Sequence, residues 1–80
     1  MWIIIRADER EMTHVDNADT ADEARGIIYN ELLNLYGGNE DRLTEDIEDG
    51  EAEFCDSDMS AWSNHKGNFD IKAFWYKTTE

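Results

Sequence analysis

Apolar residues lie in short segments along this chain, and two of the segments have the pattern of β-strands. Residues 2–6 open with Trp2 and three consecutive isoleucines, which are β-branched and fit a pleated sheet. An unbroken apolar run of this kind predicts a strand that is buried on both faces or central in its sheet. In residues 69–77 one face is apolar and the other is polar until it turns aromatic near the end. This period of two predicts a second strand.

The apolar spacing of residues 20–36 is helical. Thr20 and Glu23 stand at the two positions of a capping box, in which two side chains satisfy free N–H groups at the start of a helix. The apolar positions on one face of this helix are Ala24, Ile28, Leu32 and Leu35. The glycine pair at 37–38 ends the helix, since glycine readily takes the left-handed conformation of a C-cap. Gly26, inside the helix, predicts close packing against a sheet.

The segment before this helix and the segment after it have weaker patterns. Residues 7–18 are mostly polar, and we expect a loop there, with at most a short extended piece at Met12–Val15. Leu43 and Ile47 are four residues apart, which allows a short helix after Asn39.

The segment that leads into the last strand mixes strand and turn signals. Residues 51–55 alternate and predict a third strand. Ser57 allows a single capped helical turn that holds Met59 and Trp62. Residues 64–68 are polar, contain glycine and predict a turn.

Together these elements predict an α+β fold in a single domain, residues 1–80. We expect one amphipathic helix packed on a small antiparallel or mixed sheet of about three strands. No proline, repeat or Gly/Ser linker marks a domain boundary. The predicted core consists of Ile3, Ile5, Ala24, Ile28, Leu32, Leu35, Phe54, Ile71 and Ala73.

The net charge of the chain indicates more about its partners than any sequence motif does. Twenty Asp and Glu stand against seven Lys and Arg, giving a net charge of −13, while three Trp, three Tyr and three Phe indicate a folded chain. Residues 40–58 hold ten acids and one base, a net charge of −9. This charge disfavours direct binding to nucleic acid or to an anionic membrane, and it favours a basic protein surface as the partner. No apolar run approaches the length of a membrane span or a signal peptide.

Candidate chemistry is sparse. Cys55 and His65 are the only Cys/His pair worth considering as a nucleophile and base, and no motif supplies an oxyanion hole. Asp56, Asp58 and Ser60 begin like a calcium loop, but the later positions of that loop do not match. We therefore expect no enzyme activity, no metal site and no cofactor.

The acidic segment is the best candidate site. Acids two apart on a strand point to one side about 6.6 Å apart, and phosphates repeat every 3.4 Å or so along each DNA strand. A row of carboxylates can therefore stand in for phosphates in a basic groove. The candidate partner-binding residues are Glu45, Asp46, Glu48, Asp49, Glu51, Glu53, Asp56 and Asp58. The simpler interpretation of the same segment is a solvated, solubilising surface.

In size, acidity, a capped helix beside a few strands, and lack of a catalytic motif, the chain resembles small phage-encoded anti-defence proteins, anti-CRISPR proteins among them. The resemblance lies in overall character and not in any motif residue. It implies an inhibitor that occupies the nucleic-acid-binding groove of a protein such as a Cas nuclease by DNA mimicry, in the cytoplasm of a host cell. The alternative is a structural or assembly module, a homo-oligomer that self-associates through an aromatic patch of Trp2, Phe74 and Tyr76.

Overall fold

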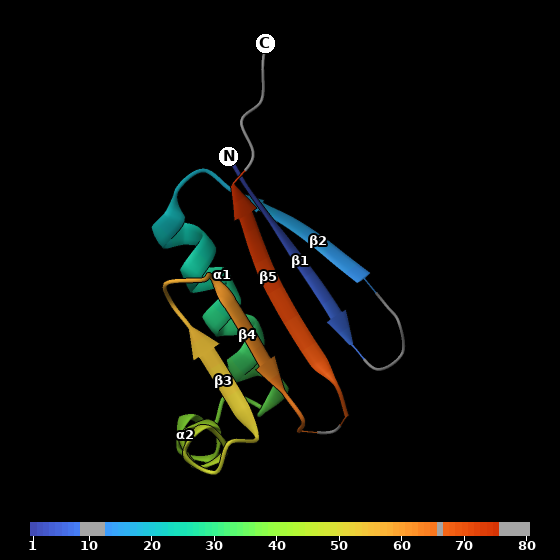
Figure 1. The fold of residues 1–80 in the computed structure, drawn as a ribbon, viewed down its shortest axis with the longest axis vertical. Helices are drawn as coiled ribbons and strands as arrows, with labels where there is room; N and C mark the ends of the chain where they lie inside the picture. Colours follow the sequence, from blue (N-terminus) through green and yellow to red (C-terminus); the bar gives the residue numbers. More distant parts are fainter. Residues whose placement is uncertain (9–12, 66, 76–80) are drawn as a thin grey trace.

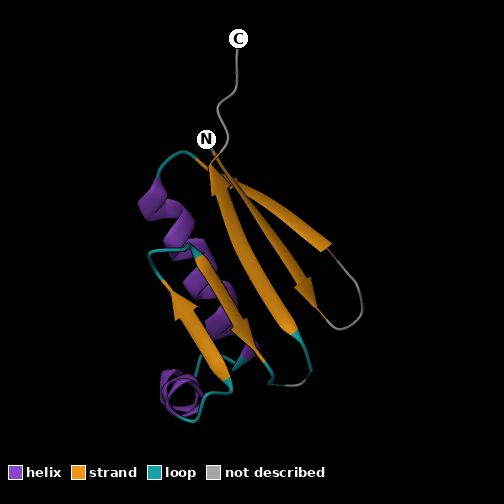
Figure 2. Ribbon diagram, viewed as in Figure 1, coloured by secondary structure: helices purple, strands orange, loops and turns teal. Residues whose placement is uncertain are grey.

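Seven helices and strands make up the fold in the computed structural model, which describes residues 1–8, 13–65 and 67–75 (Figures 1 and 2). In chain order they are β1 (Trp2–Asp8), β2 (Thr13–Ala18), α1 (Ala21–Leu35), α2 (Glu40–Glu48), β3 (Ala52–Cys55), β4 (Ser60–Ser63) and β5 (Phe69–Trp75). The predicted α+β class is confirmed, but there are two helices rather than one and five strands rather than three.

The five strands form one sheet in the order β2-β1-β5-β4-β3, and every neighbouring pair is antiparallel. The two strands that the sequence predicts most clearly, β1 and β5, pair with each other inside the sheet. The edges are formed by β2 and β3. α1 contacts β1, β2, β4 and β5 and covers one face, while α2 lies beside β3 (Figure 1).

β2 occupies part of the segment predicted as a loop. It pairs with β1 from Trp2 opposite Ala18 to Ala7 opposite Thr13. Residues 14–17 are exposed, and Ala18 is buried. An edge strand with so little burial carries no apolar alternation, so the loop prediction is wrong for residues 13–18. It is also wrong for residues 7 and 8, which belong to β1. The extended piece expected at 12–15 agrees with β2 from residue 13 onward, and residue 12 lies outside the described residues.

β4 replaces the helical turn predicted after Ser57. The chain reverses in a tight turn between β3 and β4, where Met59 takes a positive φ of 49°. Ala61 and Ser63 then point into the core, each only 1% exposed. Small residues at these positions let α1 pack closely on β4, a tertiary requirement that leaves no strand-like apolar pattern in the sequence.

α1 confirms the predicted helix at residues 20–36 to within one residue at each end. The Thr20 hydroxyl accepts a hydrogen bond from the Glu23 N–H, while the Glu23 carboxylate accepts one from the N–H of Asp19 rather than of Thr20. Gly38, at φ 82°, closes the other end by donating its N–H to the Leu33 carbonyl. The expected close packing at Gly26 is wrong, because a Cβ there would meet nothing within 4 Å.

The short helix allowed after Asn39 is present as α2. The Asn39 side chain caps it by accepting a hydrogen bond from the Arg42 N–H. Leu43 is buried, whereas Ile47 remains 40% exposed. α2 therefore attaches to the core through one main side chain and leaves most of its surface in solvent.

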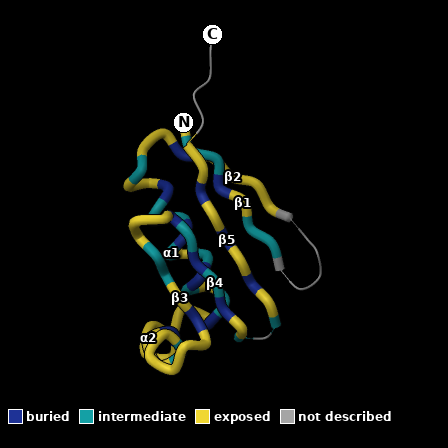
Figure 3. The backbone as a smooth tube through the Cα atoms, in the orientation of Figure 1, coloured by how far each residue is buried: buried dark blue, intermediate teal, exposed yellow. Residues whose placement is uncertain are grey.

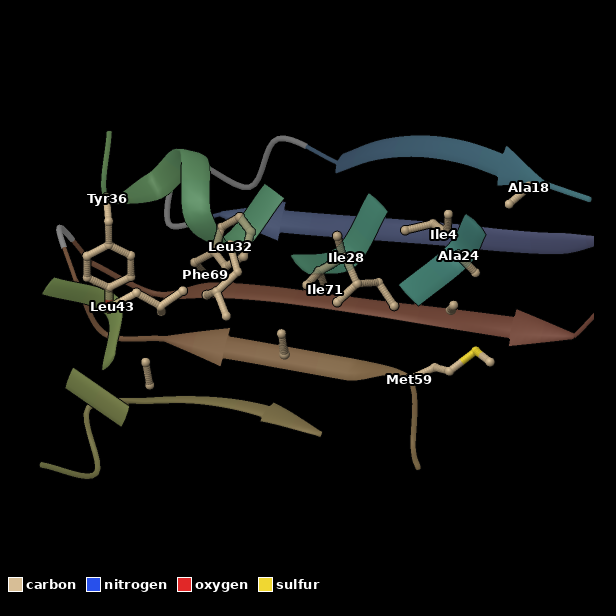
Figure 4. Close-up of a cluster of buried hydrophobic side chains, with 13 residues drawn as sticks. Ile4, Ala18, Ala24, Ile28, Leu32, Tyr36, Leu43, Met59, Phe69 and Ile71 are labelled. Atoms are coloured by element: carbon tan, nitrogen blue, oxygen red, sulfur yellow. The ribbon is translucent and has the colours of Figure 1, made fainter. Parts of the chain in front are cut away.

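The core lies between α1 and the sheet (Figures 3 and 4). Of the predicted core, Ala24, Ile28, Leu32, Ile71 and Ala73 are buried, and Leu35 and Phe54 are partly buried against them. The predicted burial of Ile3 and Ile5 is wrong, because both lie on the face of β1 opposite Ile4: Ile4 is 2% exposed, whereas Ile5 is 37% exposed. Three consecutive isoleucines give no alternation from which to choose a face, and only pairing with β5 decides it.

Candidate functional site

The eight candidate acids lie along one side of the molecule. Three are on α2 and one caps its end. One precedes β3, one lies on β3, and two are in the turn before β4. Figures 1 and 3 show this path from α2 along β3, the edge strand of the sheet. Six of the eight side chains belong to exposed residues with no ion pair among the described residues. We call this set the acidic edge: Glu45, Glu48, Asp49, Glu51, Glu53 and Asp58.

Two members of the acidic edge are held by hydrogen bonds. The Asn64 side-chain amide donates to Glu51 at 3.4 Å, and the Trp62 indole N–H donates to Glu53 at 3.3 Å. Both donors are neutral. These bonds orient the two carboxylates, and neither bond brings a positive charge to them.

Asp46 has a structural role instead. Its side chain is 15% exposed, and it accepts a hydrogen bond of 2.7 Å from the Tyr36 hydroxyl. The Tyr36 oxygen also lies 2.7 Å from the Ser63 hydroxyl, which accepts from the His65 backbone N–H. The His65 ring stacks on Tyr36 with centroids 4.4 Å apart. We call these four residues the Tyr36 cluster; it ties the end of α1 to α2 and to the end of β4.

Burial raises the pKa of Tyr36 above its usual value of 10.0, and the hydrogen bond to Asp46 acts in the same direction. Ser63 is 1% exposed, so its hydroxyl is closed to any substrate. The cluster therefore resembles a Ser/His/Asp arrangement only in residue type, and its geometry supports the fold.

Asp56 forms an ion pair with Arg25. Its carboxylate lies 2.6 Å from Nε of Arg25, whose guanidinium also lies 3.0 Å from Asp22. This ion pair joins the turn between β3 and β4 to α1. Asp46 and Asp56 are therefore separated from the acidic edge, a distinction that the sequence does not reveal.

The face of the sheet opposite α1 is a second candidate surface. Neither helix covers this face, which we call the open face. It carries Ile3, Ile5, Val15, Trp62 and Phe74. Val15 is 65% and Phe74 is 51% exposed. The sequence pattern does not reveal Ile5 and Val15 as part of this surface, because a lone valine among polar residues carries no signal and Ile5 belongs to an unbroken apolar run.

The predicted aromatic patch is not one surface. Trp2 packs edge-to-face on Trp75 with centroids 5.5 Å apart, on the side of the sheet that faces α1. Phe74 pairs with Ile3 and points to the open face. Tyr76 lies outside the described residues. Trp2 and Phe74 therefore cannot act together in one contact.

The weak catalytic candidates lie apart. Cys55 is paired with Ser60 at one end of the β3–β4 pair, and His65 follows the other end of β4. Among the residues that the structure describes, no group of three or more His, Cys, Asp or Glu is placed to hold a metal ion. No helix in the described part of the chain has the length and hydrophobicity needed to cross a membrane.

Comparisons of the whole chain with protein-family models, with curated proteins and with solved structures found no match.

Proposed function

We propose that this protein is a protein-binding inhibitor whose acidic edge occupies the basic, nucleic-acid-binding groove of another protein, such as a Cas nuclease. The observation that carries the proposal is the set of six exposed carboxylates on one edge of the fold, none with an ion pair among the described residues. A basic groove would supply cations to these six carboxylates, which have no ion-pair partner in residues 1–8, 13–65 and 67–75.

The local geometry supports a role as a phosphate stand-in. Glu51 and Glu53 are two residues apart at the start of the edge strand β3, and neutral donors orient both carboxylates. α2 adds Glu45 and Glu48 beside this strand, and its end adds Asp49. Charged groups held in place before binding lose less conformational entropy when they meet a partner.

A solvated edge is the competing interpretation, since charges on an edge strand also discourage strand-to-strand aggregation. The two interpretations differ in what happens when charge is removed without changing shape. A solvated edge tolerates that loss, whereas a phosphate mimic loses its partner.

The test is a triple substitution, Glu48→Gln, Glu51→Gln and Glu53→Gln. Glutamine keeps the side-chain size and keeps an acceptor for Asn64 and Trp62, so we expect the fold to survive. Affinity for a basic-groove partner should fall at least tenfold, because truncating one side of a buried charged contact costs about 2–5 kcal/mol. Immobilised wild-type protein should capture a nucleic-acid-binding protein from host lysate and release it to short duplex DNA.

The matched control is Asp16→Asn, Asp19→Asn and Asp22→Asn, which removes the same charge away from the acidic edge. The control should capture the same protein as the wild type, with far-UV circular dichroism confirming that both variants fold. Equal capture by the triple glutamine variant, or capture that duplex DNA does not displace, would refute the phosphate-mimic proposal.

A further inference from the structure

The open face carries little of the protein's charge, and two rows of its side chains lie on either side of the level of Ile71. The register of the sheet aligns the first row across the strands as Val15, Ile5, Lys72, Ser60 and Cys55. The second row, two residues along β5, is Ala7, Asp70, Trp62 and Glu53. One basic residue and two acids stand on these rows of a chain with a net charge of −13.

We propose that the open face binds a second copy of this chain, forming a two-fold symmetric dimer in which the two β5 strands stack antiparallel. The two-fold axis of this dimer lies in the plane of the interface, runs perpendicular to the strands and crosses β5 at the level of Ile71. It places Asp70 of each copy opposite Lys72 of the other, so the interface contains two Asp70–Lys72 pairs. An interface of this kind must be self-complementary, since residue i meets j and j meets i.

The same two-fold axis places large side chains of one copy opposite small side chains of the other. On β1, Ile5 of one copy meets Ala7 of the other, and on β4, Trp62 meets Ser60. Each contact pairs a large side chain with a small one, as stacked sheets about 10 Å apart require for interdigitation. No row position brings like charges together.

The open face also contains two hollows. One, of about 310 Å³, lies at the axis between Ile5, Lys72 and Phe74. The other, of about 440 Å³, is lined by Ala7, Trp62, Asn64, Asn68 and Asp70, among others. The two-fold operation carries the exposed Phe74 ring to the level of Asn68, at this second hollow. The ring therefore acts as an anchor that each copy inserts into the other.

The charge pattern selects this arrangement over others. Stacking the two β5 strands in parallel about an axis along β5 would place Asp70 on Asp70 and Lys72 on Lys72, which is repulsive. A basic partner, the kind that fits the acidic edge, would meet Lys72 at the centre of the open face. A second copy satisfies both charges at once.

The size of the open face indicates the class of interface to which the dimer belongs. Five strands about 4.8 Å apart, rising about 3.4 Å per residue, give a face on the order of 500 Å² per copy. The total buried area is then at the lower end for specific interfaces, which places the dimer among weak, concentration-dependent complexes. This inference does not depend on the proposed function, because it concerns the isolated protein.

The experiment uses two charge reversals, Asp70→Lys and Lys72→Asp, with sedimentation equilibrium of the purified protein. Wild type should move from 9.3 kDa toward twice that mass as concentration rises. Each variant alone places like charges opposite each other and should dimerise at least tenfold more weakly. An equimolar mixture should recover wild-type dimerisation, because the two positive side chains on β5 of one variant then face the two negative side chains on β5 of the other.

Asp16→Lys is the matched control, since Asp16 lies on the same sheet but points to the side that faces α1. This control should dimerise as the wild type does. Phe74→Ala should weaken the dimer about tenfold through loss of the anchoring ring. A wild type that stays monomeric up to about 1 mM means that the open face has another occupant and overturns the proposal. So does a mixture that remains monomeric.

Discussion

Tyr36 shows how a single residue connects the elements of this fold. Tyr36 is 7% exposed, and its hydroxyl bridges Asp46 on α2 and Ser63 on β4. Burial raises its pKa above 10.0, so the neutral phenol is favoured more in the folded than in the unfolded protein. The resulting stabilisation is complete below about pH 10 and is lost as pH rises through the folded pKa.

We therefore expect Tyr36→Phe to destabilise the protein by about 1–3 kcal/mol at neutral pH, because it leaves buried hydrogen-bonding groups without their partner. The difference between wild type and variant should shrink as pH rises above about 10, since only the wild type has this phenol to ionise. Urea denaturation of both proteins across this range measures the difference. A gap that stays constant with pH would contradict the role assigned to the Tyr36 hydroxyl.

At the scale of the element, α1 contains a glycine that lowers its stability. Gly26 is exposed in the middle of the helix, and a Cβ there has open space around it. We expect Gly26→Ala to raise the free energy of unfolding by about 1 kcal/mol, because alanine restricts the unfolded chain and favours the helix. The measurement is the midpoint of chemical denaturation.

The control for this prediction is Gly38→Ala, just beyond the same helix. Gly38 has φ 82°, where a Cβ is strained, so this change should destabilise by about 1 kcal/mol. Equal effects of the two substitutions would show that backbone conformation is not what distinguishes these glycines.

At the scale of the whole molecule, the net charge of −13 acts on the two proposed surfaces in opposite directions. Binding of the acidic edge to a basic groove is attractive and should weaken with salt, as screening shortens from about 10 Å at 0.1 M to about 3 Å at 1 M. Dimerisation brings two anions together across a largely apolar face. Salt should therefore strengthen the dimer.

The measurement is the dissociation constant of each complex at low and high sodium chloride. The two constants should move in opposite directions. A dimer that weakens as salt rises would show that the Asp70–Lys72 pairs dominate the interface and that its apolar contacts contribute little.

The elements with local signals were those that the sequence predicted correctly. The N-cap at Thr20 and the glycine pair after α1 both depend on residues within a few positions of one another. Hydrogen bonds of a helix end are made within one turn, so local sequence is sufficient to locate them. The acids of residues 40–58 were likewise visible as composition, although their individual roles were not.

What the sequence by itself determined was therefore the α+β class, the helix α1, the strands β1, β3 and β5, and the concentration of negative charge, while α2 was only allowed by it. The tertiary structure alone decided which isoleucine enters the core, that β2 and β4 are strands, and that Asp46 and Asp56 differ from the other acids. It also decided that Trp2 and Phe74 lie on opposite faces. The physical reason is strand pairing: a shift of one residue moves every side chain to the other face, and the partner strand that sets this register lies far away in the chain.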